Sequence, residues 1–455
     1  MAFQSTNPTT GKKGKTHNAH DSAEVERRLA RAHSAYVSWR AVPIQERATL
    51  MKKLARLFED GAPPLAEIAA EEMGKPIIDG IAEAKKCAWA LDYYAENAET
   101  FLAPEIIPTD FKKSFVRFDP IGPVLAVMPW NFPYWQVIRF AAPALMAGNV
   151  GLLKHASNVQ GAAFAMEDLF LEAGFPEGVF QNLAISAALV EGIIRDERVR
   201  GVALTGSERA GAAVAAIAGN EIKTSVLELG GSDPFIVLAD ADIPKAASAA
   251  TTARLQNAGQ SCIAAKRFII EAPAVDEFVA LMKERFEAMR VGDPLSIETE
   301  IGPMVSEQGM EDLLEQVRIS VQKGATVVTG GGKHARSGYF CEPTILANVT
   351  PDMPVYFEET FGPVAAVIFA KDADDAVRIA NDTRFGLGAS LWTADLRRAE
   401  EIAAAIDAGF VAINGIVKSD PRLPFGGTKK SGYGRELSRY GMLEFVNVKT
   451  VTISE

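Results

Sequence analysis

Three short segments of the chain carry side chains that could perform covalent chemistry on a carbonyl group. Cys262 ends the segment 256–262, in which a glycine-containing turn precedes the thiol. A cysteine held beyond such a turn, at the N-terminus of a helix, would gain thiolate character from backbone N–H groups. Glu228, which two glycines follow closely, could act as a general base if desolvation raised its pKa. Asn131, in the segment 129–133, could donate its amide to a developing oxyanion.

Each of these residues also has an ordinary structural interpretation. Free cysteines are usually buried and inert, and we adopt that interpretation for Cys87 and Cys341. A glutamate at a strand end is usually solvated, and a loop asparagine usually forms an Asx-turn or caps a helix. The occurrence of all three segments in one chain favours a catalytic role for Cys262.

The elements that must position these residues alternate between short apolar runs and amphipathic stretches. The pattern predicts a helical region over 21–103 and an exposed hairpin over 105–118. From Gly122 onward the alternation is typical of a parallel sheet with crossover helices, and a second α/β series begins at Pro234. In the first series the predicted strands are 124–128, 149–153 and 202–204, and the predicted helices are 133–146, 159–173 and 208–218.

The last ten residues alternate apolar and polar side chains. The apolar residues of this pattern are Val446, Val448, Val451 and Ile453. The pattern indicates an edge strand that awaits a partner, which could come from another subunit. The sequence thus predicts two α/β domains and a small sheet appendage.

The overall composition excludes several classes of protein. The chain has 455 residues, of which 48% are hydrophobic and 23% charged, as in soluble globular proteins. The 47 Lys and Arg against 58 Asp and Glu give a net charge of −11, which disfavours nucleic-acid binding. Three scattered cysteines suit neither a disulfide framework nor a zinc site, so no metal is expected. With no signal-peptide core and no apolar run of about 20 residues, we expect a cytoplasmic protein that does not contact a membrane.

The motifs together resemble the aldehyde dehydrogenase superfamily over almost the whole chain. PWNFP, LLK, TGS, ELGG, NAGQSC, EETFGPV and PFGG occur in the order typical of that family. The resemblance implies an α/β fold with two Rossmann-like parallel-sheet domains and a small oligomerisation sheet. It assigns 1–103, 119–229 and 415–440 to a cofactor-binding domain, 230–414 to a catalytic domain, and 104–118 with 441–455 to the oligomerisation sheet.

The resemblance also implies a role for each of the three reactive side chains. Cys262 matches the nucleophile, Glu228 the general base, and Asn131 the side chain that stabilises the oxyanion together with the backbone N–H of Cys262. The implied reaction passes through a thiohemiacetal, transfers a hydride to a nicotinamide, and ends with hydrolysis of a thioester.

The predicted cofactor is NADP or, as an alternative, NAD. The chain lacks the GxGxxG fingerprint, but a small-residue turn before a helix still allows close approach of a phosphate. Lys154 matches a family lysine that contacts the adenosine ribose, and Ser157 stands where NAD-preferring members carry a glutamate. A hydroxyl beside an ammonium would accept a 2′-phosphate, so NADP is preferred. The remaining cofactor-binding residues implied by the resemblance are Trp130, Gly206, Ser207, Leu229, Glu359 and Phe361.

The predicted substrate is an aldehyde with a remote carboxylate. Arg139 lies in an otherwise apolar helix, four residues after Trp135, and is either paired structurally or holds an anionic ligand. Its position matches the arginine that binds the distal carboxylate in succinate-semialdehyde dehydrogenases, and the chain resembles a bacterial branch of that group. Lys418 and Arg422 are alternatives. The substrate-binding residues expected are Trp135, Gln136, Arg139, Ser419 and Phe425.

Two other functions remain open at this stage. The enzyme could act on glutarate semialdehyde or another aliphatic or aromatic aldehyde, since Tyr134 and Trp135 could line either pocket. Cys262 and Glu228 could instead serve a thioester or ester hydrolase without redox chemistry, against which the cofactor motifs argue. The expected partners are a small aldehyde and further copies of the chain, as a homodimer or homotetramer.

Overall fold

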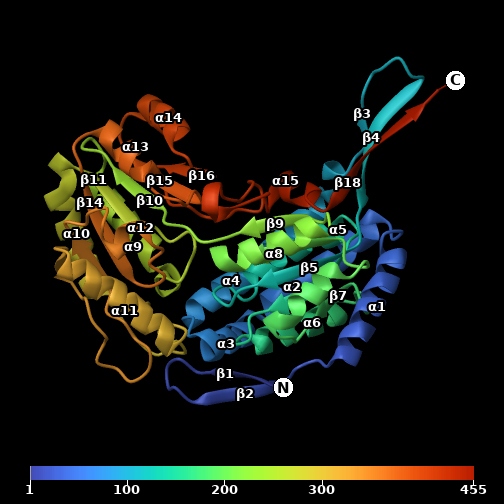
Figure 1. Cartoon of the computed structure of the whole chain (residues 1–455), viewed down its shortest axis with the longest axis horizontal. Coiled ribbons are helices and arrows are strands. Elements are labelled where there is room, and N and C mark those ends of the chain that lie inside the picture. Colours follow the sequence, from blue (N-terminus) through green and yellow to red (C-terminus); the bar gives the residue numbers. More distant parts are fainter. Residues whose placement is uncertain (1, 455) are drawn as a thin grey trace.

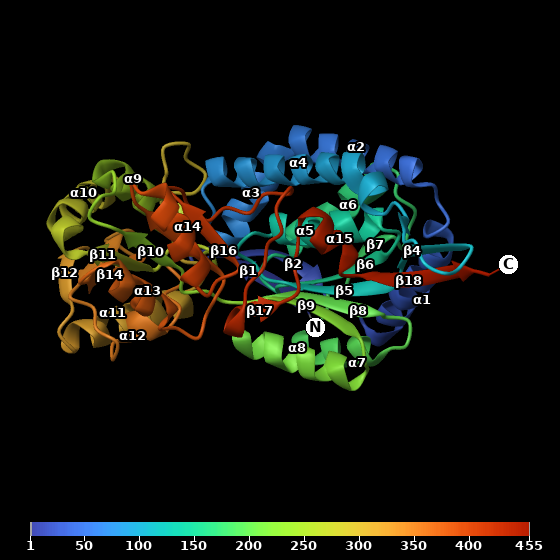
Figure 2. The ribbon, with the colours of Figure 1, turned by 90° about the horizontal axis from the view of Figure 1, so that it is seen from above.

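The computed structural model describes residues 2–454, which form four sheets and the helices packed around them (Figures 1 and 2). The chain begins with an antiparallel hairpin of β1 (Ala2–Thr6) and β2 (Lys13–Asn18). The helical region predicted over 21–103 is confirmed. Its four helices are α1 (Ser22–Trp39), α2 (Ile44–Asp60), α3 (Ala62–Met73) and α4 (Ile77–Phe101).

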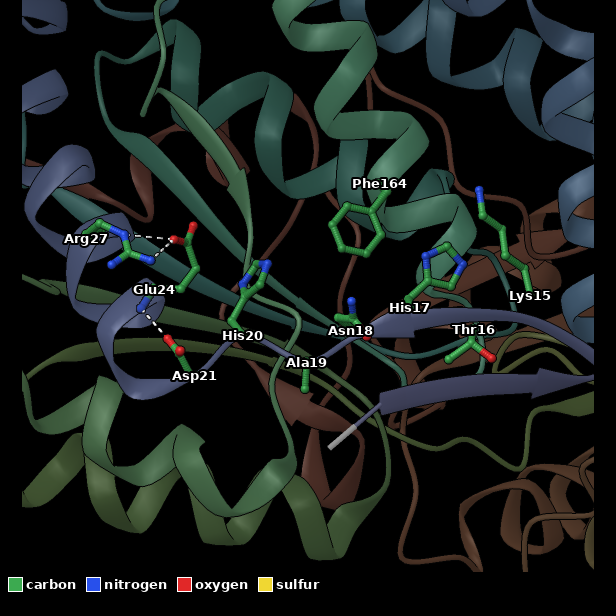
Figure 3. A pocket seen from close by; sticks show the side chains of 10 residues that line it. All are labelled: Lys15, Thr16, His17, Asn18, Ala19, His20, Asp21, Glu24, Arg27 and Phe164. Carbon is green, nitrogen blue, oxygen red and sulfur yellow. Dashed lines mark hydrogen bonds and ion pairs between the residues drawn. The ribbon is translucent and has the colours of Figure 1, made fainter.

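The N-terminal hairpin packs against the first α/β region through aromatic rings (Figure 3). His17 of β2 stacks on Phe164, with ring centroids 5.3 Å apart, and the edge of His20 meets the same ring. Burial lowers the pKa of both imidazoles, which therefore stay neutral and pack as aromatic rings. The pocket beside them contains none of the predicted site residues.

A six-stranded sheet forms the first α/β region, in the order β17-β9-β8-β5-β6-β7. Its strands are parallel except β17, a short antiparallel strand at the edge. Figure 2 shows α2, α4 and α6 on one side of this sheet and α7 and α8 on the other. The elements are β5 (Pro123–Met128), α5 (Trp135–Met146), β6 (Val150–His155), α6 (Gln160–Glu172), β7 (Phe180–Asn182), η1 (Ala187–Leu189), α7 (Val190–Arg195), β8 (Gly201–Thr205), α8 (Glu208–Asn220), β9 (Thr224–Glu228), η4 (Lys429–Ser431) and β17 (Gly432–Tyr433).

The carboxyl ends of four parallel strands bring the predicted site residues to one edge of this sheet. β5 ends at Met128, β6 at His155, β8 at Thr205 and β9 at Glu228. The chain runs outward from β5 through β6 to β7 and returns to the other side of β5 with β8, so strand order reverses between β5 and β8. Ligands of open α/β sheets bind at such a reversal, beyond the carboxyl ends of the strands.

A seven-stranded sheet forms the second α/β region, in the order β12-β13-β14-β11-β10-β15-β16. All of its pairings are parallel except that of β12 with β13, and its central strands are buried on both faces, as expected for a sheet covered by helices. The elements are β10 (Pro234–Val237), α9 (Ile243–Leu255), η2 (Gln256–Gly259), β11 (Arg267–Glu271), η3 (Ala272–Ala274), α10 (Val275–Ala288), α11 (Glu307–Gln322), β12 (Thr326–Thr329), β13 (Thr344–Ala347), α12 (Pro354–Phe357), β14 (Val364–Ala370), α13 (Ala373–Asn381), β15 (Gly388–Trp392), α14 (Leu396–Ala405) and β16 (Phe410–Ile413).

A three-stranded sheet in the order β18-β4-β3 projects from the body of the molecule (Figure 1). Strand β18 pairs antiparallel with β4 along its whole length, from Val446 opposite Pro120 to Ile453 opposite Lys113. The C-terminal strand lies at the edge of this sheet, as expected. The expectation that it awaits a partner is wrong for its inner edge, because β4 of the same chain pairs with it there. No helix within residues 2–454 combines the length and apolar character needed to cross a bilayer. The elements are β3 (Glu105–Ile106), β4 (Lys113–Pro120), α15 (Ser438–Leu443) and β18 (Val446–Ile453).

Candidate active site

Cys262 lies on the loop between η2 and β11, where two cavities meet. The larger cavity has a volume of about 550 Å³ and the smaller a volume of about 240 Å³. Cys262 and Gln136 line both of them. A nucleophile shared in this way can attack a ligand in one cavity while a second ligand is held in the other, as a two-substrate reaction requires.

The loop that leads to the thiol has an uncommon backbone. Asn257, Ala258 and Gly259 have φ values of 52°, 54° and 74°, so three consecutive residues adopt the left-handed conformation. A Cβ on Gly259 would lie 2.3 Å from the carbonyl oxygen of Gly362, so only glycine fits there. Such strain persists where surrounding contacts fix the backbone, and it is concentrated at active sites.

Lys266 fixes the other side of the same loop. Its buried ammonium donates to the carbonyl oxygens of Ser261 at 3.1 Å, Cys262 at 2.7 Å and Ala264 at 3.0 Å. Its Nζ also lies 3.5 Å from Oε1 of Glu359. Lys266 was not predicted, because no local pattern shows that a lysine directly before β11 contacts the nucleophile loop.

The structure corrects the expected cause of thiolate formation at Cys262. The residue follows a 3-10 turn and precedes an extended segment, so no helix begins at the thiol. Burial raises the pKa of Cys262 to about 12, although the charges of Arg139 and Lys266 act in the opposite direction. In the absence of a ligand the sulfur is therefore protonated, and attack on an aldehyde requires a nearby base.

Asn131 is held against the nucleophile loop by both ends of its amide. Its Oδ1 accepts from Nε2 of Gln136 at 3.1 Å, and its Nδ2 donates to the carbonyl oxygen of Gln260 at 3.1 Å. Its own carbonyl oxygen accepts from Nδ2 of Asn257 at 2.9 Å. The hydrogen bonds found within residues 2–454 use one of the two Nδ2 protons, which leaves the other for an oxyanion.

A buried ion pair fixes the segment that carries Asn131. Glu83 of α4 accepts from the backbone N–H groups of Tyr134 at 2.8 Å and Trp135 at 2.9 Å, where α5 begins. The same carboxylate pairs with Lys75, whose Nζ lies 3.9 Å from the centroid of the Phe132 ring. Neither Glu83, in α4, nor Lys75, in the connection between α3 and α4, was predicted, because no motif surrounds either residue.

Glu228 ends β9 as an unpaired buried carboxyl group. Its side chain is 2% exposed, and neither oxygen has a hydrogen-bond partner within residues 2–454. Burial raises the pKa of Glu228 well above its ordinary value, Glu436 adds to this rise, and the charge of Arg139 opposes it. A carboxylate with a raised pKa is a stronger base than an ordinary glutamate, although Glu228 does not line either cavity directly.

Arg139 lines the larger cavity but already has an anionic partner. Its guanidinium forms a buried ion pair with Glu436, donates to Oγ1 of Thr205 at 3.3 Å, and lies over the ring of Phe425. Sequence analysis left open whether this arginine is paired structurally or holds a ligand. The structure shows the pairing, and direct binding of a substrate carboxylate by Arg139 stays a prediction.

The predicted substrate residues gather on the wall of the larger cavity. Trp135, Gln136 and Arg139 reach it from α5, and Ser419 and Phe425 reach it from the segment after β16. Lys418 also lines it, whereas Arg422 pairs with Asp420 at the surface. Two further lysines of α4, Lys85 and Lys86, line the same cavity and were not predicted; Lys85 is exposed, whereas Lys86 is partly buried. Nothing in the sequence around Lys86 indicates a place in a cavity, because a lysine in an amphipathic helix is usually solvated.

Six of the eight predicted cofactor residues line the smaller cavity. The rings of Trp130 and Phe361 meet edge to face, with centroids 5.8 Å apart. Oε1 of Glu359 accepts from the N–H of Gly231 at 3.1 Å. Ser207 caps α8 by accepting from an N–H of its first turn. Gly206 and Leu229 complete this set of lining residues.

Lys154 and Ser157 lie outside both cavities, at the end of β6 and in the turn before α6. Lys154 is half-buried, and within residues 2–454 no carboxylate lies within 4 Å of its ammonium. Ser157 is exposed. Between them, His155 is fully buried and its ring contacts the carbonyl oxygens of Met128 and Pro133 at 3.1 and 2.9 Å, so it connects β6 to the Asn131 segment.

The chain is similar to known proteins over its whole length. The model of the aldehyde dehydrogenase family matches residues 1–451. The chain is 50% identical over 459 residues to "Succinate-semialdehyde dehydrogenase (NADP(+)) 1" of Mycobacterium tuberculosis and 48% identical over 454 residues to "Probable succinate-semialdehyde dehydrogenase (NADP(+))" of Synechocystis, with 100% of each chain covered. The structure of succinic semialdehyde dehydrogenase from Streptococcus pyogenes in complex with NADP+ superposes with a TM-score of 0.97 at 39% identity, covering 100% of both chains. The chain therefore belongs to the aldehyde dehydrogenase family.

Proposed function

We propose that this protein oxidises succinate semialdehyde to succinate with NADP as the hydride acceptor. The observation that carries the proposal is the position of Cys262 at the junction of two cavities, one lined by the predicted cofactor residues and one by several cations. The names of the similar proteins from Mycobacterium tuberculosis, Synechocystis and Streptococcus pyogenes support both the aldehyde and the cofactor.

The smaller cavity and the end of β6 fit the parts of NADP. Phe361 and Leu229 offer apolar surface for the nicotinamide ring, and Glu359 offers a carboxylate for ribose hydroxyls. The N-terminus of α8, just beyond Ser207, suits a phosphate. Lys154 and the hydroxyl of Ser157 suit the 2′-phosphate, which is absent from the alternative cofactor NAD. When bound, NADP would accept a hydride from the substrate carbon at its nicotinamide ring.

The chain's own residues account for the other steps. Glu228 takes the proton of the Cys262 thiol, the resulting thiolate attacks the aldehyde carbon, and the oxyanion of the thiohemiacetal accepts from Nδ2 of Asn131 and the N–H of Cys262. Loss of the hydride leaves a thioester on the sulfur. Once the first proton has passed from Glu228 to solvent, Glu228 takes a proton from water, whose oxygen attacks the thioester. The sulfur leaves and receives that proton, which releases the carboxylic acid and the thiol. The raised pKa of Glu228 suits this proton transfer.

The larger cavity suits an aldehyde that carries a negative charge. Trp135 and Phe425 offer apolar surface to a short methylene chain, and Gln136 lies beside the nucleophile. Arg139, Lys86 and Lys418 place positive charge along the same wall, beside the hydroxyl of Ser419. This charge attracts an anionic ligand more than a neutral one, so we favour a semialdehyde of a dicarboxylic acid.

The proposal extends to the organisation of the molecule. The six-stranded region would bind the cofactor and the seven-stranded region would carry the nucleophile, within the boundaries given above. The projecting three-stranded sheet exposes Ile106, Phe111, Val448 and Ile453, which a second copy of the chain would cover in a homodimer or homotetramer. The three cysteines are all free, which suits the reducing cytoplasm.

One set of assays tests the function. Succinate semialdehyde, glutarate semialdehyde, butyraldehyde and benzaldehyde are each supplied with NADP or NAD, and reduced nicotinamide is followed by absorbance. We expect the highest kcat/KM for succinate semialdehyde with NADP. A higher value for another aldehyde would replace the substrate, and thioester hydrolysis without any nicotinamide reduction would point to the hydrolase instead.

A further inference from the structure

Lys86 places an ammonium group inside the larger cavity. Its Nζ donates to Oγ of Ser419 at 2.7 Å and lies 4.2 Å from the centroid of the Trp135 ring. Within residues 2–454 no carboxylate lies within ion-pair distance of this nitrogen. The group therefore has one hydroxyl and one aromatic face as neighbours, and an ammonium can donate three hydrogen bonds.

The charges around Lys86 leave the cavity wall with a positive excess. Burial, followed by the charges of Arg139 and Lys418, lowers the pKa of Lys86 to about 8. The cavity also contains carboxylates, but Glu83 is engaged by Lys75, and burial raises the pKa of Asp79. Lys86 is partly buried, and a partly desolvated cation without a counter-ion is unfavourable, so an anionic ligand beside it would be stabilised.

Arg139 differs from Lys86 in this respect. Its guanidinium is paired with Glu436, so a ligand carboxylate placed against it would also approach the carboxylate of Glu436. At Lys86 a carboxylate would meet an ammonium with free donors and the hydroxyl proton of Ser419. The Trp135 ring beside it would cover the methylene groups of the ligand.

We propose that Lys86 and Ser419 bind the remote carboxylate of the semialdehyde and so determine the preference for an anionic aldehyde. This assignment rests on the proposed function, and it gives Arg139 the lesser role of adding positive potential. A charge-assisted contact in a partly desolvated site is among the stronger hydrogen bonds in proteins, so its loss is measurable.

Lys86→Met tests the assignment, because methionine keeps an unbranched apolar stem beside Trp135 and removes the charge. We expect kcat/KM for succinate semialdehyde to fall about 30- to 300-fold, while kcat/KM for butyraldehyde changes by less than about threefold. Lys86→Arg should recover part of the loss. Lys53→Met is the control, since it removes the same charge from an exposed lysine of α2 that lines neither cavity, and it should leave the ratio of the two efficiencies unchanged.

A binding measurement separates failure of this assignment from failure of the proposed function. Succinate should protect the Cys262 thiol of the wild-type protein from alkylation, butyramide should not, and Lys86→Met should lose the protection. Equal losses for both aldehydes, or an unchanged ratio, would overturn the assignment. If the wild type oxidised a neutral aldehyde best while succinate protection still required Lys86, the proposed function would be wrong and the carboxylate site would stand.

Discussion

Two lysines near Cys262, the buried Lys266 and the partly buried Lys86, have opposite surroundings. Behind the nucleophile, Lys266 donates to three carbonyl oxygens and lies beside Glu359, so every donor has an acceptor. In front of it, Lys86 has a single hydroxyl and an aromatic ring. The difference indicates that Lys266, whose hydrogen bonds are all made within the protein, stabilises the nucleophile loop. Lys86, which has donors without acceptors, is available to bind a ligand.

The largest effect is expected from removal of the nucleophile, Cys262, which both lysines neighbour. Cys262→Ala should lower aldehyde oxidation at least about 1000-fold, because no other group within reach forms the covalent intermediate. NADP binding, measured by fluorescence or calorimetry, should remain within about threefold, since the thiol contributes little to a dinucleotide. Substantial residual turnover would refute the covalent mechanism.

Removal of the cation behind the nucleophile should affect both aldehydes alike. Lys266→Met leaves three carbonyl oxygens and the Glu359 carboxylate without their donor, which should lower the free energy of unfolding by about 3–5 kcal/mol. The displaced loop should lower kcat for succinate semialdehyde and butyraldehyde by about 10- to 100-fold each. Denaturant unfolding and steady-state kinetics measure the two effects.

Lys86→Met provides the contrast to that variant. Its unfolding free energy should stay within about 1 kcal/mol of the wild type, because a ligand and not the protein is the missing partner. A selective loss for one aldehyde in Lys266→Met, or a large loss of stability in Lys86→Met, would contradict the division between the two lysines.

Lys154 extends the comparison to the cofactor, since it too lacks a carboxylate partner within residues 2–454. Ser157→Glu would supply one and would repel a 2′-phosphate. We expect the ratio of kcat/KM with NADP to that with NAD to fall about 10- to 100-fold, as expected for a charge-assisted contact of roughly 1.5–3 kcal/mol. Ser157→Gln, which adds similar bulk without the charge, should change this ratio much less.

The smallest expected effect is a pH dependence of substrate preference. With its pKa lowered to about 8, Lys86 is charged below that pH and neutral above it, so carboxylate binding weakens as pH rises. Arg139 and Lys418 lower this pKa, whereas Cys87 and Glu83 raise it. Between pH 7 and pH 9 the efficiency ratio of succinate semialdehyde to butyraldehyde should fall about three- to tenfold. Titration of Cys262 affects both aldehydes equally and so does not change the ratio. In Lys86→Met the ratio should not depend on pH.

Much of the fold and the list of candidate residues could be predicted from sequence because their signals are local. Apolar runs followed by glycine or proline mark the strands, and the motifs around Cys262, Glu228 and Asn131 occur at strand ends or in turns. The carboxyl ends of parallel strands lie at one edge, so residues after them are expected to meet.

The rest of the site depends on contacts between distant parts of the chain. Arg139 pairs with Glu436, and Lys86 donates to Ser419, across separations of roughly 300 residues that no local pattern reveals. The high pKa of the Cys262 thiol follows from its burial, which depends on the packing of the whole region. The partner of β18 was missed for the same reason, because β4 lies in the first third of the chain.

The late position of the segments that complete the six-stranded region has a consequence for synthesis. Strand β17 covers β9, Glu436 neutralises Arg139, and β18 pairs with β4, and all three contacts come from residues after 431. A nascent chain that has already made Cys262 would expose an open sheet edge and an uncompensated guanidinium until these residues leave the ribosome. Chains terminated early would therefore be recognisable to chaperones and proteases, although their nucleophile, base and oxyanion donor are all present.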